Sequence, residues 1–343
     1  MACLSASLLS SSCWYVRQAG HFLSERARAV PVSRLEADPG SPEELRRFLS
    51  LVEDVRAFAT EQAGLKPTRN YTGYVALDRD YVADVVSACA ADSFTRYHWR
   101  YPFLGELPYK GFYRREDAEK EAARLKAAGL DVIIRKVDAF SSLGFFRDPL
   151  YSFMTAYPPD ALAELILHES AHATLFIKGA GQFNEEFATF TGRVAAEAWL
   201  AMRYGPDSPE LAARRARRAD GEAFTAWLAE TARLLDAAYR DAAMTPEDKL
   251  ERKASIIAER AAAYREAAPR LFSGEGYRSF DMGSINNAYL DLYRLYEEDL
   301  SLYRRWYDEV AGGELPRFIS SLLELEREAG TDIKQAMLQR LGS

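Results

Sequence analysis

One stretch, residues 160–198, constrains this chain more than any other (DALAELILHESAHATLFIKGAGQFNEEFATFTGRVAAEA). It contains His168, Glu169 and His172 in the pattern H-E-x-x-H. Residues four apart on an α-helix are rotated by only ~40° and rise by ~6 Å, so both imidazoles point the same way. Two neutral imidazoles held like this are two ligands of a tetrahedral zinc site. Glu169 projects in another direction, where a base for a water on the open side of the ion is needed.

The flanking residues favour a helix at this place. Pro158, Pro159 and Asp160 form a helix start, and Gly179 and Gly181 are expected to end the helix. The side chains between them are mostly apolar or small, which predicts a buried helix in which two histidines and a glutamate need compensation by a metal. The alternative is an accidental pattern of core histidines. It is disfavoured because two of only four histidines in the chain fall at ligand spacing.

The third ligand is expected on the next helix, from about Asn184 to Arg203. The connection through Gly179, Ala180 and Gly181 is short, so the two helices should pack as neighbours. A carboxylate in the first turn of the second helix can then reach the metal. By position alone, Glu185 and Glu186 both qualify.

The stretch resembles the gluzincin class of metallopeptidases, whose third ligand is the Glu of an Asn-Glu-x-x-Ala type motif. Asn184 and Glu185 fall on that Asn-Glu pair, so the resemblance implies Glu185 as the ligand and a zincin-like core. Glu186 is then either exposed to solvent or placed next to the ligands without contacting the metal. Only twelve residues separate His172 from Glu185, fewer than in the best-known gluzincins, so the connecting loop should be compact.

Most of the chain resembles the bacterial family of predicted, or putative, aminopeptidases. The blocks that carry this resemblance are LPYKGFY (107–113), SLGFFRDP (142–149), HESAHAT (168–174), FNEEFATF (183–190) and NNAYL (286–290). The resemblance implies hydrolysis of a peptide substrate by a water on Zn²⁺, with Glu169 as proton acceptor. Such a reaction passes through an oxyanion, which a Tyr hydroxyl can stabilise. The resemblance favours Tyr296 for this role and Tyr293 second, whereas an aromatic core stripe is the alternative for Tyr289, Tyr293 and Tyr296.

Composition further narrows the classes of fold and function that the chain can have. With 343 residues and 48% hydrophobic content, the chain can bury a large core. The formal net charge of −7 argues against a nucleic-acid partner. Cys3, Cys13 and Cys89 form neither a paired framework nor a C-x-x-C motif, and no apolar run is long enough for a transmembrane helix.

The first residues leave two possibilities for localisation. Leu-Ser-Ser-Ser before Cys13 resembles a weak lipoprotein cleavage box, and related family members resemble lipoproteins with a Cys near this place. A lipid anchor at Cys13 would put the protein in the bacterial cell envelope. The alternative is an unprocessed N-terminus and a cytoplasmic protein.

The pattern along the chain predicts an α+β protein, mainly α with a small mixed β-sheet, in three parts: residues 1–68, 69–157 and 158–343. Helices are expected after Ser41 and, interrupted near Thr245, from Pro206 to Arg270. The middle part should contain a β-α-β unit: strand Leu107–Tyr113, helix Arg115–Ala128 and strand Asp131–Val137. Tyr81–Val86 suits a strand or a short helix. Ser141–Phe146 is either a substrate-pairing edge strand or a loop.

Other functions stay open. The protein could be a metal-bearing envelope protein that binds peptide or a partner without turnover, although such a site has no need of Glu169. Hydrolysis of a non-peptide amide would use the same residues. An aminopeptidase also needs a carboxylate for the substrate amine, for which Glu106, Asp148 and Glu186 are candidates.

Overall fold

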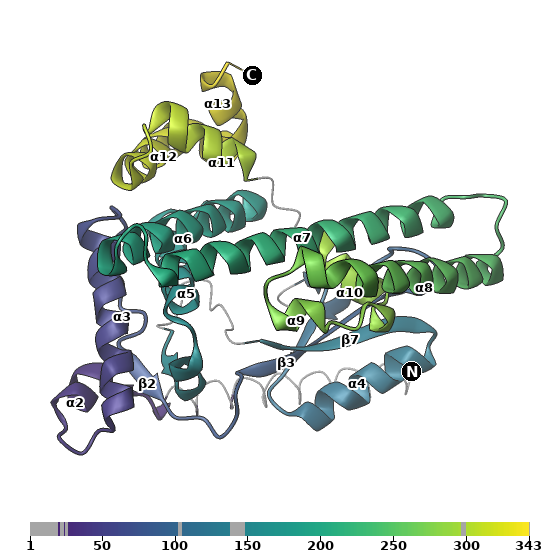
Figure 1. Ribbon diagram of the computed structural model, residues 1–343, viewed down its shortest axis with the longest axis horizontal. Helices are drawn as coiled ribbons and strands as arrows, with labels where there is room; N and C mark the ends of the chain where they lie inside the picture. Colours follow the sequence, from purple (N-terminus) through teal and green to yellow (C-terminus); the bar gives the residue numbers. More distant parts are fainter. Residues whose placement is uncertain are drawn as a thin grey trace, which may run out of the picture. The chain divides into compact units, whose positions relative to one another are not determined.

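The computed structural model describes residues 27–101, 105–137, 148–295 and 300–342, together with residues 20 and 24. Helices make up most of these residues and the strands are short, which confirms the predicted mainly helical α+β class (Figure 1). The chain divides into two compact units that are interleaved in sequence. Unit 1 comprises residues 1–80, 141–212 and 298–343, and unit 2 comprises residues 81–140 and 213–297.

Unit 1 contains both helices of the H-E-x-x-H stretch, α5 and α6, which pack along each other as predicted. Helix α3 packs against α5 through apolar side chains at three- and four-residue steps, including Phe48, Val52, Val55 and Phe58. The elements of unit 1 are β1 (Val30–Pro31), α2 (Val32–Ala37), α3 (Glu43–Glu61), β2 (Gly73–Val75), β8 (Leu150–Tyr151), η1 (Ser152–Ala156), α5 (Pro159–Thr174), α6 (Gly181–Tyr204), α11 (Ser301–Arg305), the π-helical turn η3 (Trp306–Val310), α12 (Leu315–Ala329), η4 (Gly330–Asp332) and α13 (Ile333–Arg340).

A small sheet in unit 1 has the order β1-β2-β8. Strand β2 pairs antiparallel with β1 and parallel with β8, with Tyr74 opposite Leu150 and Val75 opposite Tyr151. Because β8 leads through η1 into α5, this sheet lies directly before the helix that carries His168 and His172.

Unit 2 is built on a second sheet of order β6-β3-β7, in which β3 pairs antiparallel with both neighbours. Helix α4 covers one face of this sheet and α10 covers the other (Figure 1). The elements of unit 2 are β3 (Ala83–Ala90), β4 (Trp99–Tyr101), β5 (Gly105–Leu107), β6 (Lys110–Phe112), α4 (Arg115–Ala127), β7 (Leu130–Val137), most of α7 (Pro209–Tyr239), α8 (Pro246–Leu271), α9 (Glu275–Arg278), η2 (Met282–Ser284) and α10 (Asn287–Leu295).

The predicted β-α-β unit is present as β6, α4 and β7, with β3 inserted between its two strands. The segment Leu107–Tyr113 is not one strand, however. It is divided between the end of β5 and β6, because Pro108 lacks a backbone N–H and the chain turns there. The segment near Tyr81 is a strand, β3, rather than a helix.

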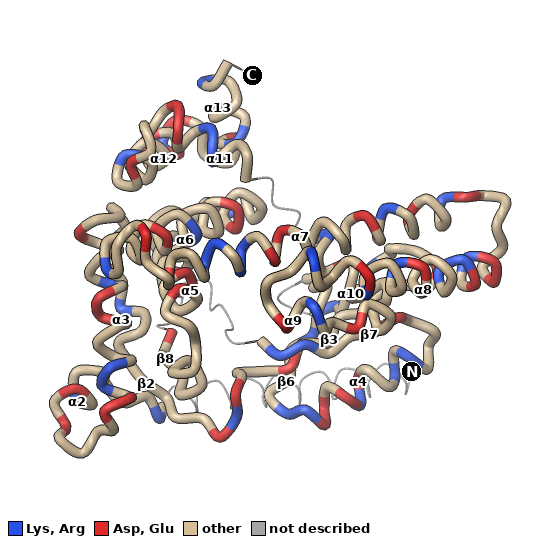
Figure 2. The backbone as a smooth tube through the Cα atoms, viewed as in Figure 1, with Lys and Arg blue, Asp and Glu red and all other residues tan. Residues whose placement is uncertain are grey.

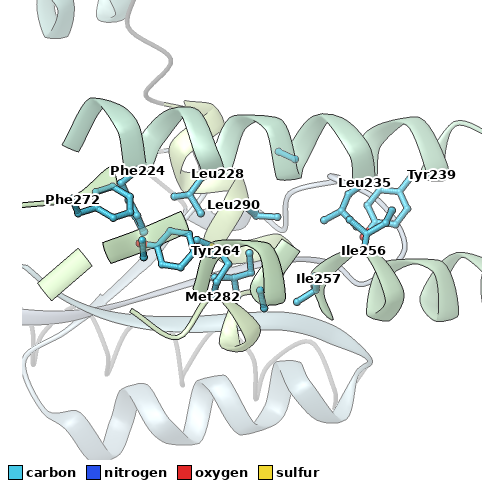
Figure 3. Close-up of a cluster of buried hydrophobic side chains, with 14 residues drawn as sticks. Phe224, Leu228, Leu235, Tyr239, Ile256, Ile257, Tyr264, Phe272, Met282 and Leu290 are labelled. Carbon is cyan, nitrogen blue, oxygen red and sulfur yellow. The ribbon is translucent and has the colours of Figure 1, made fainter. Parts of the chain in front are cut away.

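The two long helices of unit 2 enclose its hydrophobic core. Phe224, Leu228 and Leu235 of α7 face Ile256 and Tyr264 of α8, as Figure 3 shows. The predicted interruption at Thr245 is a capping box: the Thr245 hydroxyl accepts a hydrogen bond from Asp248 N at 3.1 Å, and Asp248 Oδ2 accepts one from Thr245 N at 3.0 Å. Both basic and acidic residues occur along each of these helices (Figure 2).

Candidate metal centre

Helices α5 and α6 bring the three predicted ligands together. His168 Nε2 and His172 Nε2 lie 3.1 Å apart. Glu185 Oε2 lies 3.9 Å from His168 Nε2 and 3.7 Å from His172 Nε2, which is too long for a hydrogen bond. The histidine side chains are 23% and 18% exposed and Glu185 is 56% exposed, so the cluster opens to solvent on the carboxylate side.

This donor set fits a zinc ion. Two imidazole nitrogens and one glutamate oxygen are a known catalytic zinc set, and ligands at about 2.1 Å in a tetrahedron are roughly 3.3–3.5 Å apart. The observed separations of 3.1–3.9 Å bracket that spacing. The two Nε2 atoms are 3.1 Å apart, so at most one N–H can lie between them. At least one nitrogen lone pair therefore faces the common centre.

The electrostatics of the cluster also suit metal binding. Burial is the main reason that the pKa of His168 falls to about 4; the neighbouring His172 and Arg193 act in the same direction, and Glu185 opposes them. His168 is therefore neutral at pH 7, the form in which an imidazole binds a metal. The nearby His172 imidazole lowers the pKa of Glu185, which keeps this carboxylate charged.

Glu169 lies beside the cluster and differs from Glu185 in its surroundings. Burial is the main reason that the pKa of Glu169 rises to about 7; the carboxylates of Asp148 and Glu185 act in the same direction, and His172 opposes them. A carboxylate with a pKa near neutrality is suited to accept and return a proton at pH 7.

The end of α5 lies earlier than predicted, at Thr174 rather than near Gly179. The Thr174 carbonyl accepts a hydrogen bond from Lys66 Nζ at 2.9 Å, and the Thr174 hydroxyl accepts one from Lys66 N at 2.9 Å. Lys66 thus satisfies a carbonyl at the helix end that has no partner within the helix.

Asn184 holds the connection between the two helices. Its side chain, 1% exposed, accepts a hydrogen bond from Ile177 N at 2.9 Å and donates one to Ile177 O at 2.8 Å. The backbone N–H and C=O of Ile177, in the loop, are thereby both hydrogen-bonded without water. The residue before Glu185 thus anchors the connection to the first turn of α6.

Tyr71 is a residue that the sequence did not single out. It has a φ of +60°, a conformation that bulky side chains rarely adopt, and is 3% exposed. Its N–H donates to Asp148 O at 2.6 Å. Burial raises its pKa well above the usual value, and the charges of Glu169 and Asp148 add to this. Backbone strain of this kind is often found at functional sites.

The remaining residues that the sequence suggested for the site differ in where they lie. Tyr296, Cys13 and the segment Ser141–Phe146 lie outside the described residues, so their roles stay predictions. Tyr293 packs in the core of unit 2, with its hydroxyl 3.3 Å from that of Tyr289. Glu186 is not exposed: it is 1% exposed and paired with Lys334, so it is engaged within the protein.

Within the described part of the chain, no helix is both long and apolar enough to cross a bilayer.

Residues 13–337, nearly the whole chain, match the family described as "Putative aminopeptidase". No curated protein and no solved structure matches the chain. The matched range includes α5, α6 and all three converging side chains. The chain therefore belongs to the putative aminopeptidase family.

Proposed function

We propose that this protein is a zinc-dependent aminopeptidase with a gluzincin-type site in a zincin-like core. The observation that carries the proposal is the convergence of three ligand atoms, from His168, His172 and Glu185, within 4.8 Å of one another. Family membership supports peptide hydrolysis as the reaction class.

His168, His172 and Glu185 would hold the ion through Nε2, Nε2 and a carboxylate oxygen. A zinc ion bound there supplies Lewis acidity and lowers the pKa of a coordinated water toward ~7. Glu169 accepts a proton from the attacking water at its carboxylate and returns that proton to the leaving amine nitrogen.

The variant Glu169→Gln tests the proposal, because it preserves the shape of the side chain and removes the base. We expect one zinc per chain, as in the wild type, and a kcat lowered by ~10²–10⁴. Glu230→Gln is the control: Glu230 lies on α7 and pairs with Arg233 at the surface, so its loss should leave kcat unchanged.

The assay is digestion of a peptide library, read by mass spectrometry, with free and N-acetylated versions of each peptide. An aminopeptidase shortens only the free peptides, one residue at a time. Equal cleavage of acetylated peptides would contradict the aminopeptidase assignment. A wild-type chain that holds zinc and cleaves no peptide would replace the enzyme proposal with binding without turnover.

A further inference from the structure

Glu186 is a buried carboxylate that the proposed reaction does not use. It follows Glu185 on α6 but is 1% exposed, whereas the Glu185 side chain is 56% exposed. Glu186 accepts three hydrogen bonds: from Gln182 Nε2 at 2.9 Å, Tyr303 Oη at 3.0 Å and Lys334 Nζ at 2.7 Å. It is therefore held more firmly than an ordinary surface glutamate.

Two of these partners come from the C-terminal segment, defined as residues 300–342. Tyr303 lies on α11 and Lys334 on α13, 117 and 148 residues beyond Glu186. A buried carboxylate is costly unless a positive charge compensates it. Lys334, whose side chain is 35% exposed, supplies that charge from the solvent side.

Aromatic packing also holds the C-terminal segment against α6. Phe183 and Phe190 of α6 lie 5.9 Å and 6.2 Å from the Tyr303 ring, measured between ring centroids. Phe187 and Phe190 lie 6.1 Å and 5.2 Å from the Phe318 ring. These phenylalanines recur at three- and four-residue steps, so they form one face of α6. The C-terminal segment thus covers one face of the same turns of α6 that present Glu185 to the histidines.

We propose that the C-terminal segment positions the metal site, with Glu186 and Lys334 as positioning residues. By anchoring the first turns of α6, they fix the helix rotation at which Glu185 Oε2 stays within 4 Å of His168 and His172 Nε2. Neither residue contacts the ion or the substrate. This inference rests on the proposed function, since it assumes that Glu185 is a ligand.

The test is zinc retention by the full chain, measured as the zinc affinity from equilibrium competition with a chromophoric chelator of known zinc affinity. Lys334→Met leaves Glu186 buried without its counter-charge, and we expect zinc affinity to fall by roughly 10-fold or more, as when residues behind a ligand are changed. Lys334→Arg retains the charge and should restore most of the affinity. Tyr303→Phe, which removes only the hydroxyl, should lower zinc affinity by a smaller factor. It provides a second measurement if Lys334→Met folds poorly.

The matched control is Arg340→Met. Arg340 also lies on α13, but its ion pair is with Glu328, and both side chains are exposed. This variant should retain zinc like the wild type. In Lys334→Met, kcat should return to the wild-type value at saturating zinc, whereas general misfolding would lower kcat at every zinc concentration.

The double variant Glu186→Gln with Lys334→Met removes the charge and its counter-charge together. If charge compensation is the cause, it should lose less zinc affinity than Lys334→Met alone. Wild-type zinc affinity in Lys334→Met would overturn the inference and leave the proposed function intact. A loss of zinc affinity in Arg340→Met as large as that in Lys334→Met would overturn the role of Glu186. A wild-type chain that takes up no zinc overturns the proposed function and the inference with it.

Discussion

Gly192 of α6 lies directly against His168 of α5. A methyl group on Gly192 would lie 3.1 Å from His168 Cβ, 3.2 Å from His168 N and 3.1 Å from the Glu164 carbonyl oxygen. Two of these neighbours are backbone atoms of another helix, which cannot move aside as a flexible side chain can. The absence of a side chain at position 192 therefore permits the helix separation at which Glu185 reaches the histidines.

Gly192→Ala should separate the two helices at this point. We expect a loss of about 1–3 kcal/mol in the free energy of unfolding, despite the higher helix propensity of alanine, together with weaker zinc binding. Thermal unfolding and zinc titration measure the two effects.

Gly221→Ala is the control for that variant. Gly221 also lies inside a helix, but a methyl group there meets only the Tyr277 hydroxyl, at 3.5 Å, an ordinary contact. This change should leave zinc binding unaltered and raise stability by up to about 1 kcal/mol. Equal stabilisation by Gly192→Ala would contradict the close approach of α5 and α6.

Asn184→Asp should disrupt the connection between the helices. The carboxylate still accepts the hydrogen bond from Ile177 N but cannot donate to Ile177 O, and it places a charge at a site that is 1% exposed. We expect the free energy of unfolding to fall by about 2–4 kcal/mol, as measured in urea. Unchanged stability would show that the Ile177 contacts contribute nothing.

Metal removal should expose the cost of burying Glu169. Its pKa in the folded metal-free chain is about 7, above the ordinary value of 4.5, so the folded state binds more protons than the unfolded state between these values. Stability of the metal-free chain should therefore fall as pH rises from about 4.5 to 7, by up to about 3 kcal/mol. Glu169→Gln should remove this fall, which thermal unfolding in chelator at several pH values would reveal. An identical pH dependence in both chains would contradict a raised pKa.

Acid should weaken unit 2 through Asp220, a group unrelated to the metal. Burial raises the pKa of Asp220, but hydrogen bonds from Ser273 N at 2.9 Å and Gly274 N at 2.7 Å outweigh this and leave the pKa below its ordinary value. Its contribution is complete above the unfolded-state pKa and is lost as pH falls through the folded-state pKa. Asp220→Asn should destabilise the protein at pH 7, with a smaller effect near pH 2 by circular dichroism.

Features that depend on neighbours in sequence could be predicted. The pairing of α5 with α6 followed from helix spacing and a short connection, and the capping box at Thr245 from the residue types at its start. The convergence of the His168 and His172 side chains was likewise predictable, since residues four apart on a helix must face together.

Features set by residues distant in sequence could not be predicted. The end of α5 depends on Lys66, 108 residues before Thr174, and the burial of Glu186 depends on Lys334, 148 residues after it. The strained backbone of Tyr71 is imposed by its neighbours in the fold, including the Asp148 carbonyl. The interleaving of the two units also leaves no mark in local composition.

The most direct test of the central claim is zinc X-ray absorption spectroscopy of the chain loaded with one equivalent of metal. The account predicts two imidazole nitrogens and oxygen ligands at about 2.0–2.2 Å, with one imidazole lost in His172→Ala. A sulfur ligand at about 2.3 Å, or a spectrum unchanged by His172→Ala and Glu185→Gln, would show that the metal binds elsewhere and would contradict the account.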